Sequence, residues 1–203
     1  GDKIFWKKVL KRTALIFLIG LFLNWWPFVT EVNRLIEGSN ELHKITIFKG
    51  FTWLDYSKDK AGNIVETIKG IRIFGVLQRI ALCYFFASVI IYYLKPRKAF
   101  LAGLIILLVY WVLSYVGNTA DPYSLKGWFG TDIDKAILGE VHMYKGEGMP
   151  FDPEGLMSTF AAIVQVIFGF MVGIYIQNKS KEFVHDSGKM ETTVNGMYQM
   201  LTG

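Results

Sequence analysis

The run LMSTFAAIVQVIFGFMVGIYI, residues 156–176, carries no charged residue and decides the fold class. Its length matches the roughly 20 apolar residues that a helix needs to cross a bilayer core. Three further apolar runs have similar length, at residues 13–29, 75–94 and 99–116. Backbone polar groups in lipid must be satisfied within their own segment, so each run is expected to be helical. The sequence therefore predicts an all-α, polytopic integral membrane bundle, with about four transmembrane helices that form part of a larger bundle.

Composition agrees with a membrane protein. Hydrophobic residues make up 52% of the chain and charged residues only 19%, against roughly 25% charged residues in soluble domains. A soluble protein with buried helices would have to explain why four apolar runs each reach membrane length. The single cysteine, Cys83, excludes a disulfide framework and a thiolate metal site. No basic stripe with interleaved aromatic residues indicates nucleic acid as a partner.

Charge placement predicts the orientation in the membrane. Basic clusters fall at residues 7–12, 95–98 and 179–181, and all three lie on one side if every run crosses. The other side receives segments 30–70 and 117–155, and the second of these is acidic. The positive-inside rule then makes the basic loops cytoplasmic and the acidic loops external. Residues 1–176 are taken as the membrane region, and residues 177–203 as a polar tail or the truncated continuation of a longer protein.

Two arginines near the start of the second run are candidate binding residues. Arg79 lies about one turn inside the run, where an ionisable side chain is costly and indicates function. Arg72 lies seven residues earlier on nearly the same helix face, and Gln78 borders that face. The alternative is that both arginines extend to the headgroups. Asn24, near the external end of the first run, could bind a ligand or only the neighbouring helix.

The segment PFDPEG, residues 150–155, places two carboxylates before the fourth run. Asp152 before a proline suits the start of a helix, because its carboxylate can cap free backbone amides. Glu154 heads a polar stripe that continues through Ser158 and Gln165 on one helix face. If the second and fourth runs are neighbours, Glu154 could pair with Arg79. We therefore predict Glu154 as a catalytic residue and Ser158 as a binding residue.

The external loop TDIDKAILGEVHMY, residues 131–144, contains one candidate acid/base residue. His142 can exchange a proton near neutral pH, although a lone loop histidine is more often structural. Asp132 and Asp134 could in principle hold a divalent cation, but no third ligand stands at a recognisable spacing, so no metal is predicted.

Several segments together resemble the transmembrane acyltransferases related to heparan-α-glucosaminide N-acetyltransferase, and in particular their bacterial members. The segments are IRIFGVLQRIALCYFFAS (71–88), IDKAILGEVHMY (133–144), FDPEGLMSTFAAIVQVIFGFMVG (151–173) and KRTALIFLIGLFLNWWPF (11–28). The resemblance implies an enzyme of the bacterial inner membrane that takes acetyl from cytoplasmic acetyl-CoA, as co-substrate, to an amino sugar or glycan outside. The residues at the family's motif positions are Arg72, Gln78, Arg79, His142, Asp152, Glu154 and Gly155.

The chain also departs from that family. The family's acetyl-accepting histidine lies near an early span that has no counterpart here, so His142 is not equated with it, and the chain is expected to be inactive as an isolated piece. The expected partners are the lipid bilayer and a sugar or glycan acceptor, and a homo-oligomer is left open. The alternative functions are a transporter or flippase for a sugar or anionic substrate, or a scaffold whose polar residues only join helices.

Overall fold

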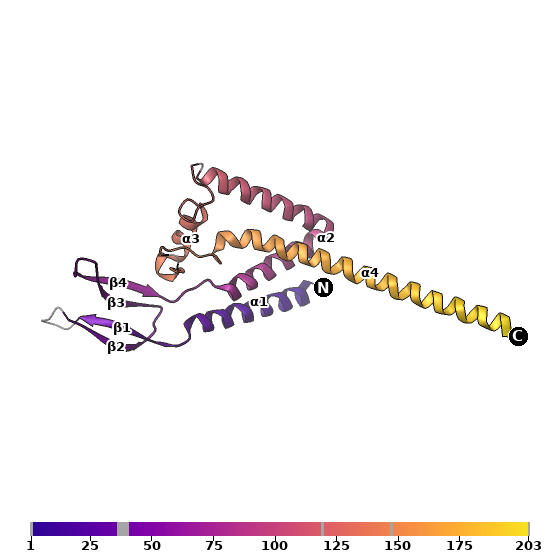
Figure 1. Ribbon diagram of the computed structural model, residues 1–203, viewed down its shortest axis with the longest axis horizontal. Helices are drawn as coiled ribbons and strands as arrows, with labels where there is room; N and C mark the ends of the chain where they lie inside the picture. Colours follow the sequence, from indigo (N-terminus) through magenta and orange to yellow (C-terminus); the bar gives the residue numbers. More distant parts are fainter. Residues whose placement is uncertain (1, 36–40, 119, 147, 203) are drawn as a thin grey trace.

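The computed structural model describes residues 2–35, 41–118, 120–146 and 148–202, with side chains described through residue 181. Figure 1 shows long helices with paired strands and short loops gathered at one end. The helices are α1 (Asp2–Trp25), α2 (Val76–Gly117), α3 (Gly130–Leu138) and α4 (Leu156–Thr202), with a 3₁₀ turn η1 (Glu140–His142). The strands are β1 (Val29–Leu35), β2 (Leu42–Phe48), β3 (Thr52–Lys58) and β4 (Ile64–Gly70).

The four strands show that the all-α prediction is wrong, because the described chain is mixed α and β. β1 pairs antiparallel with β2, and β3 pairs antiparallel with β4, as two separate two-stranded sheets. Segments such as VTEVNRL and IVETIKG are rich in β-branched residues, which favours strands. Asn33 joins the two hairpins, since its backbone N–H donates to Asp55 Oδ1 at 2.8 Å and its side-chain amide donates to the Tyr56 carbonyl at 3.0 Å.

The prediction of about four transmembrane helices is also wrong. Among the described residues, two helices are long and apolar enough to cross a membrane, Val76–Gly117 and Leu156–Lys181. In their most apolar windows only 17% and 28% of the residues are buried inside the protein. A core helix of a soluble protein would be mostly buried, so these values support a membrane location.

The first predicted run, residues 13–29, fails because its helix stops early. α1 ends at Trp25, a proline follows at position 27, and strand β1 begins at Val29. Proline lacks the N–H that would continue the helix. The apolar helical part, residues 13–25, therefore measures about 20 Å at 1.5 Å per residue, short of the roughly 30 Å of a hydrocarbon core.

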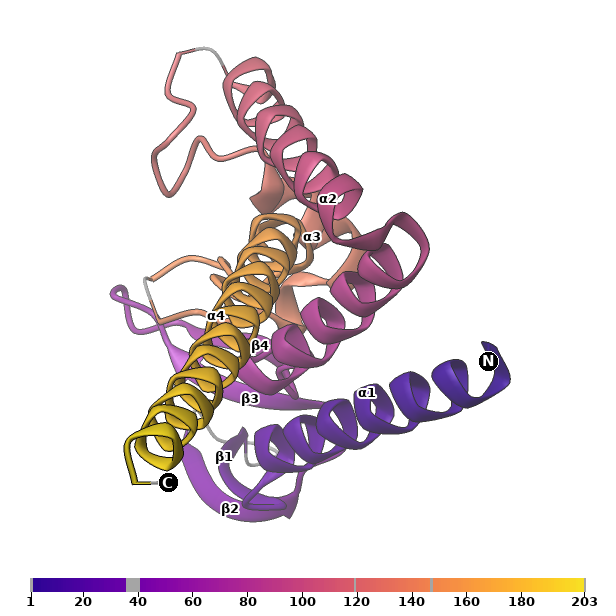
Figure 2. The same cartoon turned by 90° about the vertical axis from the view of Figure 1, so that its right-hand side faces the viewer.

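The second and third predicted runs, residues 75–94 and 99–116, are two arms of one bent helix. α2 bends at Lys95, whose φ of 60° and ψ of 163° are not helical, directly before Pro96. Figure 2 shows the two arms diverging from this bend. The fourth run begins where expected, at Leu156. α4 then continues through Thr202, so the segment 177–203 is a continuation of this helix as far as residue 202.

Small side chains let the helices pack closely. A buried cluster joins both arms of α2 to α4 and consists of Cys83, Ala87, Ala99, Ala162, Ile163 and Ile167. Gly20 of α1 faces α2, and a Cβ at this glycine would lie 2.7 Å from Leu77 Cβ. Both hairpins, α3 and η1 lie at the end where α1 stops and α2 and α4 begin (Figure 1). We call this end the hairpin side.

Candidate functional site

The linker between β4 and α2, residues 71–75, is held by hydrogen bonds on both sides. The Ile71 carbonyl accepts from His142 Nδ1 at 2.7 Å, and the Ile73 N–H donates to the His142 carbonyl at 3.2 Å. The Arg72 carbonyl accepts from Asn24 Nδ2 at 3.1 Å. Asn24 and His142, two predicted site residues, therefore fix the backbone around Arg72.

The Arg72 side chain binds both carboxylates of the segment before α4. Its Nη2 lies 2.6 Å from Asp152 Oδ1 and its Nε lies 3.2 Å from Asp152 Oδ2, so this contact is bidentate. Nη2 also donates to Glu154 Oε2. The ring of Tyr144 lies 5.0 Å from the guanidinium carbon, within the range of a cation–π contact. We call Arg72, Asp152 and Glu154 the carboxylate cluster.

Burial makes the carboxylate cluster a strong interaction. The Asp152 side chain is fully buried, and that of Arg72 is 29% exposed. Burial lowers the pKa of the Arg72 guanidinium, but the hydrogen bonds and charges of Asp152 and then of Glu154 outweigh it, so the pKa is raised above its ordinary value. Arg72 therefore stays charged and binds both acids.

The predicted pair of Glu154 with Arg79 does not form. Arg72 binds the Glu154 carboxylate instead, while Arg79 Nη1 donates to the Pro153 carbonyl at 3.1 Å. Ser158 Oγ donates to the same carbonyl at 2.8 Å and to the Gly155 carbonyl at 3.1 Å. Ser158 thus closes the first turn of α4 and is not positioned as a ligand-binding residue.

Asp134 caps α4, while Asp152 Oδ1 accepts from the Glu154 N–H at 3.2 Å, two residues before the helix begins. Asp134 belongs to α3, and its Oδ1 accepts from the Met157 N–H at 3.2 Å. A Cβ at Gly155 would overlap Asp134 Oδ2, so glycine is required for this close approach. Asp134 is fully buried, and this burial raises the pKa of its carboxyl to about 6. Asp152 thus binds both Arg72 and a backbone N–H, while Asp134 caps the helix itself.

The hydrogen bond of His142 fixes its tautomer. A carbonyl can only accept, so Nδ1 carries the proton that binds the Ile71 carbonyl. In the neutral ring Nε2 then holds the lone pair. The ring is buried and lies 4.2 Å, between centroids, from the Phe51 ring. The sequence identified this histidine, and the structure adds which nitrogen can accept a proton.

Gln78 lies near Asn24, since a Cβ at Gly75 would be 3.1 Å from Gln78 Oε1 and 3.1 Å from Asn24 Nδ2. Its side chain is 1% exposed and faces α1, where a Cβ at Gly20 would lie 2.8 Å from Gln78 Oε1. Its Nε2 has no hydrogen-bond partner within the described residues. The structure therefore places Gln78 in the packing between α1 and α2.

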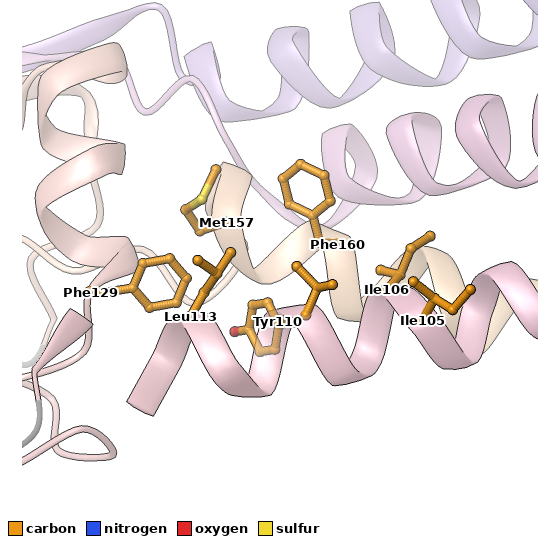
Figure 3. Close-up of a pocket in the computed structure, with 8 residues that line it drawn as sticks. Ile105, Ile106, Tyr110, Leu113, Phe129, Met157 and Phe160 are labelled. Atoms are coloured by element: carbon orange, nitrogen blue, oxygen red, sulfur yellow. The ribbon is translucent and has the colours of Figure 1, made fainter. Parts of the chain in front are cut away.

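Two hollows adjoin the carboxylate cluster. A groove of about 520 Å³ runs between α2 and α4 and includes Arg79, Cys83, Glu154 and Gln165 in its lining. We call it the Arg79 groove. A second, apolar pocket of about 400 Å³ lies between the far arm of α2 and α4, where Figure 3 shows Met157 and Phe160 opposite side chains of α2. Tyr110 is the only one of its lining residues, among those the structure describes, that has a polar side-chain group.

No metal site is evident in the part of the chain that the structure describes, where no three His, Cys, Asp or Glu side chains gather. Sequence reasoning missed two contributors to the site, the cap from Asp134 and the Tyr144 ring beside Arg72. Asp134 itself was considered only as a metal ligand. No family, curated protein or solved structure matches the chain.

Proposed function

We propose that the chain forms part of a membrane acyltransferase related to heparan-α-glucosaminide N-acetyltransferase. Its reaction moves an acetyl group from acetyl-CoA on the cytoplasmic side to an amino sugar or glycan on the hairpin side. The observation that carries this proposal is the carboxylate cluster, which lies beside a histidine of fixed tautomer at the ends of two membrane helices. Such a combination offers an anionic site for an amine together with a proton acceptor.

Glu154 is the residue that binds the amine of the acceptor sugar. Arg72 binds its Oε2, while Oε1 has no hydrogen bond among those of the described residues. Its side chain is 21% exposed, so this second oxygen can be reached by a ligand. Because Arg72 already binds Oε2, Glu154 orients the amine N–H groups by accepting hydrogen bonds at Oε1.

His142 is the residue that accepts the proton. With Nδ1 bound to the Ile71 carbonyl, the lone pair of Nε2 can take a proton from the amine as it attacks the thioester carbonyl. The new C–N bond forms as the C–S bond breaks, and the proton finally reaches the CoA thiolate. Arg72 holds Glu154 in place and keeps the charge of the buried Asp152 compensated.

The test uses the protein as its native gene encodes it, reconstituted in proteoliposomes. Acetyl-CoA labelled in the acetyl group is added on one side, and glucosamine or another amino sugar is supplied on the other. The expected result is labelled N-acetyl sugar, formed at a rate that depends on both substrates. Absence of transfer across a range of amino sugars would reject the proposal.

A transporter or flippase for a sugar or anionic substrate is the second candidate. It is favoured by the Arg79 groove, which carries a cation between two membrane helices. Its distinguishing result is substrate flux across the same proteoliposomes without any acyl donor.

A further inference from the structure

The Arg79 groove opens sideways from the protein. Its walls are the first arm of α2 and the facing side of α4. Three apolar side chains on these walls are exposed, Val76 by 60%, Ile80 by 47% and Val166 by 40%. Both helices are long and apolar enough to cross a membrane, so this opening faces the acyl chains of the bilayer.

Arg79 supplies a cation that forms no ion pair with an acid in residues 2–35, 41–118, 120–146 and 148–181. Its Nη1 donates a hydrogen bond to the Pro153 carbonyl. Glu154 also lines the groove, but its Oε2 is bound by Arg72 and not by Arg79. A guanidinium has five N–H donors, so most of those on Arg79 remain for a ligand.

The depth of the groove matches one leaflet. Arg79 is the fourth residue of α2, close to the hairpin side. Tyr84 and Gln165, at the other end of the groove, lie eight and nine residues from the starts of α2 and α4. At 1.5 Å per residue the groove therefore extends roughly 12 to 14 Å along the helices. This is about half of the roughly 30 Å hydrocarbon core.

We propose that the Arg79 groove binds an anionic phospholipid of the leaflet on the hairpin side. Arg79 holds the lipid phosphate, because guanidinium and phosphate form strong bidentate hydrogen bonds. One acyl chain lies along Ile80 and Val166, whose side chains already face the opening. The Arg79 guanidinium favours an anionic lipid over a zwitterionic one, because a zwitterionic headgroup carries no net charge to compensate the cation. This site does not depend on acyl transfer.

Electron paramagnetic resonance with spin-labelled lipids tests the proposal. The native protein is reconstituted in phosphatidylcholine vesicles that contain trace spin-labelled phosphatidylglycerol or spin-labelled phosphatidylcholine. The motionally restricted fraction then gives the relative affinity for each lipid. We expect a preference of about tenfold for phosphatidylglycerol, as one charge-assisted contact of roughly 1.4 kcal/mol would give. Inorganic phosphate at 10 mM is expected to leave this fraction unchanged.

Four variants make the test specific. Arg79→Gln should abolish the preference, and Arg79→Lys should keep most of it. Val166→Trp fills the groove and leaves the cation, so it should also lower the restricted fraction. Arg97→Gln is the matched control, because it removes an arginine at the bend of α2, beyond the far end of the groove.

Three results would overturn the proposal. The first is an Arg79→Gln variant that keeps the native lipid preference. The second is displacement of phosphatidylglycerol by inorganic phosphate, which would assign the cation to a free anion. The third is efficient photocrosslinking from position 166 to another protein segment, which would show that a helix fills the groove.

Discussion

Removal of Arg72 is expected to destabilise the protein strongly. Arg72→Gln leaves the fully buried Asp152 carboxylate without its bidentate partner at 2.6 and 3.2 Å. Breaking one side of a buried ion pair costs about 3 to 5 kcal/mol. The arginine side chain is 29% exposed, so water screens part of the interaction and the expected loss is near the lower value, about 3 kcal/mol.

A second substitution should recover part of this loss. In Arg72→Gln/Asp152→Asn the buried acid is replaced by a neutral amide, whose burial costs less than that of an uncompensated charge. We expect the double variant to be about 1 to 3 kcal/mol more stable than Arg72→Gln alone, the range of coupling energies between contacting residues. The measurement is reversible unfolding in mixed micelles, followed by circular dichroism, which gives the free energy of unfolding.

The hairpins provide a matched control. Lys69→Gln also breaks an ion pair at 2.6 Å, to Asp55, but the lysine side chain is 51% exposed. An exposed pair contributes about 1 kcal/mol or less. The reasoning would be refuted if Arg72→Gln cost no more than Lys69→Gln, or if the double variant were no more stable than Arg72→Gln.

Three further predictions concern neighbouring residues. Because burial raises the pKa of Asp134 from 3.8 to about 6, the fold favours its neutral form. The contribution of Asp134 to the free energy of unfolding is therefore fully present below pH 3.8 and is lost as the pH rises through about 6. At about 1.4 kcal/mol per pH unit, this contribution changes by about 3 kcal/mol between pH 3 and 8. Unfolding titrations should show the change as a pH-dependent difference in the free energy of unfolding between wild type and Asp134→Asn. Equal pH profiles of the two proteins would contradict the prediction. Gly155→Ala should cost about 1 to 3 kcal/mol in the same titrations, because its methyl overlaps Asp134, while Gly169→Ala, with nothing within 4 Å, should cost nothing. His142→Asn keeps a donor for the Ile71 carbonyl but removes Nε2, so it should preserve stability and lower acetyl transfer about 100-fold. His142→Gln should lower both the stability and the acetyl transfer. A fully active His142→Asn variant would show that the histidine takes no part in the reaction.

Hydrophobicity predicted the membrane helices only in part. The run at 156–176 gave the start of α4 correctly, because an uncharged segment of membrane length has few other stable structures. The run at 13–29 was predicted as one span because it is uncharged and of suitable length. The proline at position 27 stops the helix before the end of the run.

The strands could have been predicted and were missed. The β-branched residues of IVETIKG are a readable strand signal, and so is the turn that follows β3, where Asp59 Oδ1 accepts from the Asn63 N–H at 2.8 Å. The prediction of a helical bundle for the whole chain left no place for these strands. Segment 30–70 contains no run of membrane length, so nothing required it to be helical.

The candidate site residues were found, but their partners were not. Arg72, Glu154 and His142 carry charge or acid/base chemistry in unusual places, which a sequence reveals. The choice of Arg72 over Arg79 as the partner of Glu154 depends on the path of the linker 71–75, which His142 and Asn24 fix from separate elements. The cap from Asp134 likewise comes from a residue 23 positions before Met157. Such contacts depend on tertiary structure and not on local pattern.

Acetyl transfer by Glu154→Gln is the most direct test of the proposed site. In proteoliposomes of the native protein, this variant keeps the side-chain shape but loses the charge that orients the amine, so transfer from labelled acetyl-CoA to an amino sugar should fall about 100-fold. Glu66→Gln, the same substitution on an exposed position of β4, should transfer at the native rate. Native transfer by Glu154→Gln would contradict the assignment of the carboxylate cluster as the acyl-acceptor site.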